Sequence, residues 1–447
     1  MHTSTGAFVR DSHFIRVRQV FHAVGHGTFF AGIAWRLDGC GTVFRWVYDC
    51  GSKRTTKIAA AIAAGPHAFE PIDLLVISHF DDDHINGIEE LIRTRRVCRL
   101  ALPYLDFPQR LAQAASIKGE VTSCSTALFQ LDPLGWLERK GLSDRVDSIL
   151  FVEGGLDDDN DPQPDAGAPQ LPNPRQLGGG QNETALASIS RGEQMFLEMR
   201  LTGAQAVPSK KAMAWAHKTT LHDKDDRIEF MFFNSEQPNL FRFAQDGTRC
   251  AKRSGATVGQ LQLEVQAIVQ KYRMLDASGP PRRKWRDALR SCYMRHFGAS
   301  SQDRNNISLC LLVSPRKSTP RKSCISETQY PSGRETRRVC LGERAGLLCL
   351  GDLRIDVSTI NAMKAHFGQK RWDSMAVIQV PHHGSKNSWV DGNAKALNPD
   401  CFVHCVPDIS NHHPHSGVQS DLVGYPDLAA KYWTGVGFDY CLSIYPT

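Results

Sequence analysis

The residues best suited to do chemistry lie close together, in the segment Ser78-His79-Phe80-Asp81-Asp82-Asp83-His84. Four of them can ligate a metal ion: His79, Asp81, Asp83 and His84. Imidazole nitrogens and carboxylate oxygens are the groups that hold Zn²⁺, Mn²⁺ or Fe²⁺. So many ionisable groups after an apolar segment cost free energy unless a counter-charge neutralises them, and a divalent cation fits that need. A polar loop that caps a helix is the competing interpretation, and it accounts for Asp82 alone.

Three further motifs follow the same order as the landmarks of one known superfamily. They are Tyr48-Asp49-Cys50-Gly51, Leu348-Cys349-Leu350-Gly351-Asp352 and Pro381-His382-His383-Gly384-Ser385. Together with His79-x-Asp81-x-Asp83-His84, they resemble the metallo-β-lactamase superfamily, whose HxHxDH signature here takes the form HxDxDH. The resemblance implies a four-layer αβ/βα sandwich and a metal-dependent hydrolase.

Within the superfamily, the chain is most similar to the metallo-β-lactamase domain of bacterial DNA-internalisation (competence) proteins. That domain carries an Asn-Asn-x-Ser strand, which Asn305-Asn306-Ile307-Ser308 matches. The resemblance covers roughly residues 14–97 and 305–447. It departs from the family at Gly25-His26-Gly27-Thr28, where the family has Gly-Gln-Gly-Asp, and in lacking the family's membrane-spanning part.

The resemblance also implies a set of ligands for two divalent ions, Zn²⁺ or Mn²⁺. His79 and Asp81 would hold one ion, Asp352 would bridge both, and the second ion would take the remaining three: Asp83, His84 and His383. The first site then lacks a third protein ligand, which His217 or His222 could supply. Its oxygen-rich ligands favour Mn²⁺ over Zn²⁺.

The resemblance further implies hydrolysis by a hydroxide that two metal ions, about 3.5–4 Å apart, activate. Asp83 would orient this nucleophile. His382 would contact the substrate or protonate the leaving oxygen, or else it is a hydrogen-bond partner of a ligand. The candidate substrate-binding residues are Ser385, Lys386, His413, Asn305 and Ser308. For Ser385 and His413, a capping role and a place in a histidine-rich surface loop are the respective alternatives.

The pattern of elements predicts an α/β fold. Strands are expected at 14–23, 28–36, 43–48 and 73–78, and the alternation with helices at 57–64 and from 85 onward is typical of that class. Residues 1–153 would form the first half of the sandwich domain and residues 303–447 the second half. Residues 154–302 would hold a linker loop, two strands (195–201 and 228–233) and a mainly helical insertion.

The insertion, residues 240–297, is expected to be a lid over the site or a surface for a protein partner. The run Asp157-Asp158-Asp159 is no calcium loop, because Pro162 stands where the sharp turn needs glycine. A basic loop is expected at 316–338, either a mobile loop beside the site that suits a polyanionic substrate or a disordered surface loop. Helices are expected at 358–366 and 428–433.

Composition limits the setting of the protein. The chain has 447 residues and a formal net charge of +6, which is a weak sign of an anionic partner. Its 13 cysteines form no CxxC pair, and no membrane span or secretory signal is visible, so a cytoplasmic protein is expected.

The favoured function is that of a phosphodiesterase or nuclease, with nucleic acid as the substrate. Hydrolysis of a small phosphodiester, such as a cyclic nucleotide or phosphocholine ester, is the alternative. Hydrolysis of a carboxyl ester, lactone or thioester comes third. A non-catalytic metal-binding interaction module is the hypothesis from another class, and the intact ligand set argues against it.

Overall fold

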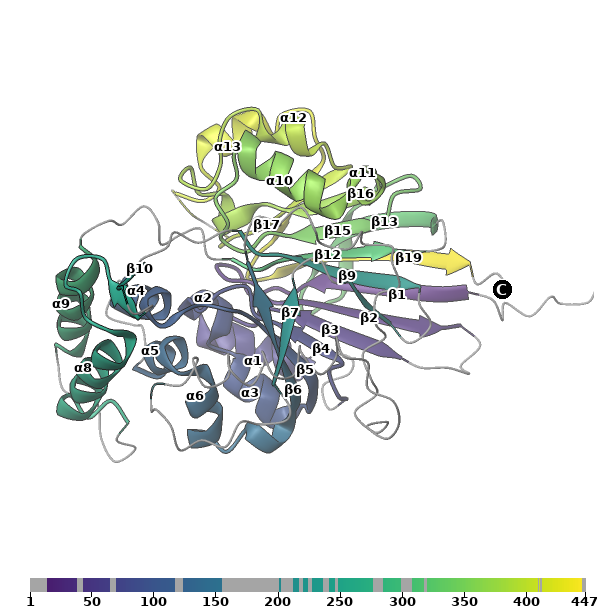
Figure 1. Ribbon diagram of the computed structural model, residues 1–447. Helices are drawn as coiled ribbons and strands as arrows, with labels where there is room; N and C mark the ends of the chain where they lie inside the picture. Colours follow the sequence, from purple (N-terminus) through teal and green to yellow (C-terminus); the bar gives the residue numbers. More distant parts are fainter. Residues whose placement is uncertain are drawn as a thin grey trace, which may run out of the picture.

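Two β-sheets pack face to face, and helices cover their outer faces (Figure 1). The computed structural model describes residues 14–37, 43–64, 70–116, 124–154, 201, 212–216, 220–223, 227–235, 241–245, 248–275, 284–298, 308–316, 320–408, 410 and 412–443.

In the described part of the chain, the first sheet has ten strands, antiparallel from β14 to β3 and parallel from β3 to β7. In spatial order they are β14 (Arg334–Cys340), β13 (Pro320–Gln329), β19 (Thr434–Ser443), β1 (Phe14–Phe21), β2 (Phe30–Arg36), β3 (Phe44–Tyr48), β4 (Leu74–Val76), β5 (Val97–Pro103), β6 (Val146–Glu153) and β7 (Ala212–Ala216).

Seven strands of the second sheet lie among the described residues, parallel from β18 to β15 and antiparallel from β15 to β8. Their order is β18 (Asp427–Ala430), β17 (Cys401–Cys405), β16 (Met375–Gln379), β15 (Gly346–Cys349), β12 (Cys310–Pro315), β9 (Ile228–Phe233) and β8 (Leu221–His222). β9, predicted as part of the intervening segment, is thus a strand of the sandwich itself.

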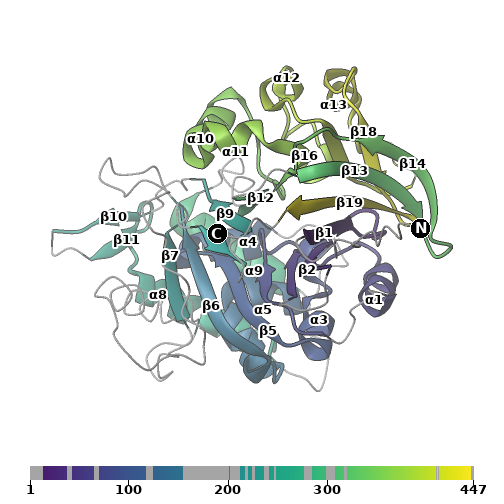
Figure 2. The same ribbon diagram turned by 90° about the vertical axis from the view of Figure 1, so that its right-hand side faces the viewer.

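Helices form the two outer layers. Against the first sheet lie α1 (Thr55–Ala64), α3 (Ile88–Thr94), α4 (Phe107–Ser116), α5 (Cys124–Leu131) and α6 (Pro133–Arg139), with the single-turn α2 (Asp82–Ile85) after β4. Against the second lie α10 (Val357–Phe367), α11 (Gln369–Asp373), α12 (Asn393–Leu397) and α13 (Ser416–Asp421). Figure 2 shows α10 to α13 on one side of the sheets and α1 and α3 on the other.

The core is divided by the sheets, as alternating side chains require. Ile15, Val17 and Phe21 of β1 point between the two sheets, where they meet β9 residues such as Phe230. Separate apolar clusters lie under each helical layer. The predicted four-layer αβ/βα sandwich is confirmed by this layering.

The described part of the insertion comprises the hairpin β10 (Phe241–Phe243) and β11 (Arg249–Ala251) with helices α8 (Val258–Lys271) and α9 (Trp285–Phe297). Figure 1 shows α8 and α9 beside α4 and α5, at one end of the molecule. Arg249 pairs with Asp106 at 2.9 Å, and Cys124 Sγ donates to the Met274 carbonyl. The insertion therefore extends the helical layer of the first sheet.

Two predicted elements were wrong. Residues 427–430 form β18 instead of a helix, because pairing with β17 at the sheet edge overrides the helix propensity of Leu428 and its alanine neighbours. The basic segment 316–338 is largely the hairpin β13–β14, paired with β19, and not a loop. The strand expected at 195–201 and the linker 154–184 fall almost wholly outside the described residues. Among the described helices, none is long and apolar enough to cross a membrane.

Candidate metal centre

The candidate ligands gather where neighbouring strands end. Asp49 directly follows β3, His79 follows β4, Asp352 follows β15 and His383 follows β16. Because the carboxyl ends of parallel strands share one edge of a sheet, side chains distant in sequence meet there. Each of these strands is buried, so the position of its end is fixed by the core.

The first group of ligand atoms belongs to His79, His84 and Asp352. His84 Nε2 lies 3.2 Å from Asp352 Oδ1, and His79 Nε2 lies 3.5 Å from Asp352 Oδ2. All three residues are buried. The structure thus places His84 beside His79, whereas the resemblance assigned these two histidines to different ions.

The second group belongs to His26, Asp83 and His383. Asp83 Oδ2 lies 3.4 Å from His383 Nε2 and 3.5 Å from His26 Nε2. Lys53 Nζ lies 2.7 Å from His26 Nε2 and 3.6 Å from Asp83 Oδ2. His26 therefore offers its Nε2 to a metal ion only when Lys53 releases it.

Unpartnered polar atoms show that these residues fit divalent cations. Nε2 of His79, His84 and His383 and Oδ1 of Asp352 are buried and have no hydrogen-bond partner among the described residues. Leaving such atoms unpaired costs about 1–3 kcal/mol each, which a ligated cation would offset. A metal ion in each group would complete the coordination of the atoms that point inward.

Hydrogen bonds with residues outside the two ligand groups fix the orientation of the His84 and His383 rings. His84 Nδ1 donates to Asp49 Oδ2 at 2.8 Å, and His383 Nδ1 donates to the Cys405 carbonyl at 2.7 Å. Each bond leaves the lone pair of Nε2 facing the ligand group, which is how metal-binding histidines are commonly held. Asp49 also accepts from the amide and the hydroxyl of Ser78, so it orders the start of the motif loop.

The charges of the site reinforce one another. Burial would raise the pKa of Asp352, but His382, His84 and His79 hold it well below its usual value. Burial would likewise raise the pKa of Asp83, but the neighbouring His383, His84 and Lys53 hold it well below its usual value. Both carboxylates are therefore ionised at neutral pH and available to a cation.

Unusual backbone conformations aim the late histidines. His382 and His383 both have left-handed backbones, with φ of 48° and 56°. This conformation costs non-glycine residues free energy and is found at functional sites. It turns His383 toward Asp83 and His382 toward Asp352, where His382 Nε2 lies 3.6 Å from Asp352 Oδ2. His382 thus borders the first group without belonging to it, and His222 on the edge strand β8 does not join that group either.

Three further candidates from the sequence, Asp81, His413 and Lys386, lie outside the two ligand groups. Asp81 is exposed at the rim, its Oδ2 3.9 Å from His79 Nε2. The His413 ring lies 5.5 Å from that of His26 and 6.5 Å from that of His382, so it borders both groups. Lys386 is exposed.

Ser308 and Ser385 are buried, and their contacts are with the chain itself. The Ser308 hydroxyl accepts from the Asp352 amide at 3.0 Å, and Ser385 Oγ accepts from the Asn387 amide at 3.3 Å. Through these contacts, Ser308 and Ser385 stabilise the loops that carry Asp352 and His383. Asn305 and His217 lie outside the described residues.

Sequence reasoning missed three residues of this centre: His26, Asp49 and Lys53. His26 was noted only as part of a departure from the family motif, and Asp49 only as part of a landmark. The glycines beside them carried the available signal. A Cβ at Gly51 would lie 2.4 Å from the Asp83–His84 peptide, so this backbone must approach the motif loop closely.

A third group of potential ligands, Glu264, Cys292 and His296, lies between α8 and α9. His296 Nε2 pairs with Glu264 Oε2 at 2.8 Å, and its Nδ1 contacts Ser254 Oγ at 2.6 Å. Arg295 takes the other oxygen of Glu264 at 2.7 Å. Because these atoms already have partners, the group is a polar staple between the two helices.

Comparison with known proteins gives only distant likenesses. No protein-family model and no curated protein matches the chain. A metallo-β-lactamase fold protein, YhfI from Bacillus subtilis, aligns at 9% identity and a TM-score of 0.33, over 95% of this chain and 99% of that one. A long form RNase Z from yeast aligns at 9% identity and a TM-score of 0.29, over 93% of this chain and 36% of that one. Likenesses this distant carry no argument about activity.

Proposed function

We propose that the protein is a metal-dependent hydrolase of phosphodiesters, with nucleic acid as its first-choice substrate. One observation carries the proposal: two groups of histidine and aspartate side chains bring their ligand atoms together, and four of these atoms are buried without a hydrogen-bond partner among the described residues. His79, His84 and Asp352 would hold one divalent ion, and Asp83 and His383 with His26 the other. Zn²⁺ or Mn²⁺ suits these ligands.

Divalent ions held there would supply two effects, lowering the pKa of water and neutralising charge on a phosphoryl oxygen. The chain's own groups would do the rest. Asp83, held ionised, would accept a hydrogen bond from the attacking water and orient it. Burial lowers the pKa of His382, so at neutral pH its neutral ring can accept a proton or a hydrogen bond at the substrate.

Basic groups around the centre fit an anionic substrate. Lys53 lies beside Asp83, and its side chain is 58% exposed, so its ammonium group can reach a phosphate. Lys386 and His413 stand on neighbouring loops. A positively charged rim raises the local concentration of a polyanion. The metallo-β-lactamase resemblance of the motifs points to the same chemistry.

A small phosphodiester is the second candidate, supported by a polar cavity that includes His413. Its volume is about 460 Å³, within the range of ligand pockets. Among its walls are side chains that donate hydrogen bonds to anions: Ser410, His413, His415, Gln419 and Lys431. A cyclic nucleotide or a phosphocholine ester fits these dimensions, whereas a polymer would pass across the rim.

The decisive experiment compares substrates in the presence of Mn²⁺ or Zn²⁺. Labelled single-stranded DNA, duplex DNA, RNA and a cyclic dinucleotide are incubated with the protein and with Asp83→Asn. Polymer cleavage that falls at least ~100-fold in the variant supports the nuclease. Turnover of the cyclic dinucleotide alone supports the second candidate. Asp82→Asn is the matched control, because Asp82 bonds to Thr126 Oγ1 and belongs to neither group.

Binding of metal without turnover of any phosphodiester would contradict the proposal and favour a non-catalytic module. Metal content is therefore measured on the same samples by elemental analysis.

A further inference from the structure

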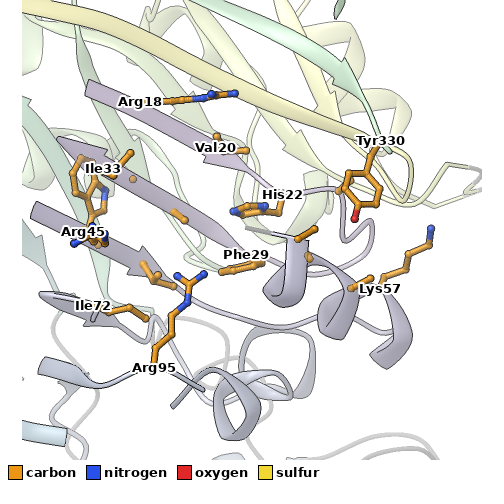
Figure 3. A pocket seen from close by; sticks show the side chains of 18 of the residues that line it. Arg18, Val20, His22, Phe29, Ile33, Arg45, Lys57, Ile72, Arg95 and Tyr330 are labelled. Atoms are coloured by element: carbon orange, nitrogen blue, oxygen red, sulfur yellow. The ribbon is translucent and has the colours of Figure 1, made fainter. Parts of the chain in front are cut away.

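A second cavity, apart from the metal centre, opens on the outer face of the first sheet beside α1. Its volume is about 550 Å³, within the range of small-molecule sites. Strands β1 to β3 form its floor, and α1 and the tip of the β13–β14 hairpin flank it (Figure 3). None of the residues that line it belongs to the two ligand groups.

The floor of this cavity is aliphatic and aromatic. It is formed by Val20, Phe29, Ala31, Ile33, Val47 and Ile72, and Ala60 and Ala61 of α1 extend this apolar surface from the flank. Contact between apolar surface of this kind and a hydrocarbon body is favourable, because it removes both from water. The only neutral hydrogen-bonding side chains among the described lining residues are those of Thr56, Tyr330 and His22 and the indoles. The lining therefore has few neutral hydrogen-bonding groups that could recognise the polar edge of a nucleobase.

The charged groups of the lining are all basic: Arg18, Arg45, Lys57 and Arg95. Among the described lining residues there is no aspartate or glutamate. Figure 3 shows the Arg95 guanidinium reaching toward Phe29, with Arg18 and Lys57 at separate margins. Arg95 is buried, and the Nε of Arg45 is buried without a hydrogen-bond partner among the described residues.

Among the described residues, Glu70, Asp439 and Asp408 lie near Arg45, Arg18 and Lys57 respectively. Arg45 Nη2 lies 3.6 Å from the exposed Glu70, and Arg18 Nε lies 4.0 Å from Asp439. His22, stacked on Phe29 at 4.3 Å, faces Arg95 and Arg18, and its pKa falls to about 4 by burial and by these two charges. An anion in the cavity would relieve this concentration of positive charge.

We propose that this cavity binds an amphipathic anion, a small molecule with an aliphatic body and a carboxylate-like head. The aliphatic floor takes the body, and the arginines around it take the head. Neither an inorganic anion nor a neutral hydrocarbon uses both features. This site is independent of the proposed phosphodiesterase activity.

Isothermal titration with laurate, below its micelle concentration, tests the proposal on the full chain. Saturable binding of laurate is expected, with binding at least ~10-fold weaker for dodecanol, which lacks the charge, and for acetate, which lacks the chain. AMP is titrated as well, as an anion with a nucleobase in place of the aliphatic chain. The proposal would be overturned if dodecanol bound as tightly as laurate, if AMP bound more tightly than laurate, or if laurate showed no saturable binding.

Two pairs of variants locate the binding. Arg18→Gln is expected to weaken laurate binding roughly 3- to 10-fold, and Arg16→Gln is expected to leave it unchanged. Both arginines lie on β1 near Asp439, but only Arg18 lines the cavity. Ala61→Trp, which fills the cavity from α1, should abolish binding, while Ala59→Trp on the exposed face of the same helix should not. If Arg18→Gln and Ala61→Trp both bind laurate as tightly as the parent protein, with unchanged circular dichroism, laurate binds elsewhere and the proposed site is refuted.

Discussion

His84 is held from two sides, and this arrangement explains why Asp49 matters at the scale of single residues. Asp49 accepts from His84 Nδ1 at 2.8 Å and from the Ser78 hydroxyl at 2.6 Å, in a fully buried setting. His84 Nε2 then faces Asp352. The Asp49 carboxylate thereby fixes the tautomer and the orientation of the His84 ring, although Asp49 itself belongs to neither ligand group.

We expect Asp49→Ala to lower the affinity for Mn²⁺ or Zn²⁺ about 10- to 100-fold, because the His84 ring loses its orientation. Titration calorimetry with the metal measures this effect. Asp147→Asn, which alters a surface pair with Arg96, serves as the control. An unchanged affinity in Asp49→Ala would show that packing alone orients His84.

His22 predicts a pH dependence of stability. Its pKa in the folded chain is about 4, against an ordinary value of 6.5, so between these values the unfolded chain binds a proton that the folded chain does not. Stability therefore falls as pH drops from about 6.5 toward 4, with His22 contributing roughly 1–3 kcal/mol in total.

Urea unfolding at pH 7 and pH 4.5 measures this contribution. His22→Phe should lose less stability over that range than the parent, while His412→Gln, at an exposed position, should behave like the parent. A parallel loss in His22→Phe would assign the pH dependence to other groups.

At the scale of elements, the motif loop is locked between backbones. The Thr28 amide donates to the Asp83 carbonyl at 3.1 Å, and the Cys50 amide donates to the His84 carbonyl at 2.8 Å. On the other side, Gln130 of α5 donates to the Phe80 carbonyl. The loop is thus part of a rigid frame, and glycines at its closest approaches make that frame possible.

We expect Gly51→Ala to destabilise the fold by about 1–3 kcal/mol and to weaken metal binding, because the new methyl group meets the Asp83–His84 peptide. Denaturant unfolding and metal titration measure the two effects. Gly259→Ala is the control, because open space surrounds this glycine near the start of α8. Equal stability of the two variants would mean that the motif loop can move aside.

At the scale of the whole molecule, the metal centre joins both halves of the sandwich. His79 and His84 follow strands of the first sheet, and Asp352 and His383 follow strands of the second. An ion bound between them would link the two sheets. It would bind the folded chain only, since no such centre exists in the unfolded chain.

Mn²⁺ or Zn²⁺ at a free concentration a hundredfold above its Kd is therefore expected to raise the free energy of unfolding by about 2.7 kcal/mol. This corresponds to a thermal midpoint Tm a few degrees above that of the EDTA-treated protein. Differential scanning calorimetry measures the shift. His383→Ala should remove the part of the shift that the second group contributes, and Glu264→Gln, at the staple between α8 and α9, should retain the whole shift. A shift that Glu264→Gln removes would place the stabilising ion in the insertion.

The sequence alone determined the types of ligand and the order of their motifs, because both are written in local patterns. The apolar run at 73–78 indicated a strand before the motif, and the helix at 358–366 and the helical character of the insertion were readable from local patterns as well. The layered fold followed from this alternation and from the family resemblance.

Only the tertiary structure decided which ligands meet. The pairing of His84 with His79, the entry of His26 and the supporting place of Ser308 depend on strand ends that lie far apart in the chain. β18 was misread for the same reason, since its partner β17 outweighs local propensity. The basic cavity beside α1 also had no sequence signature, because its arginines come from separate strands and loops and become neighbours only when the sheet forms.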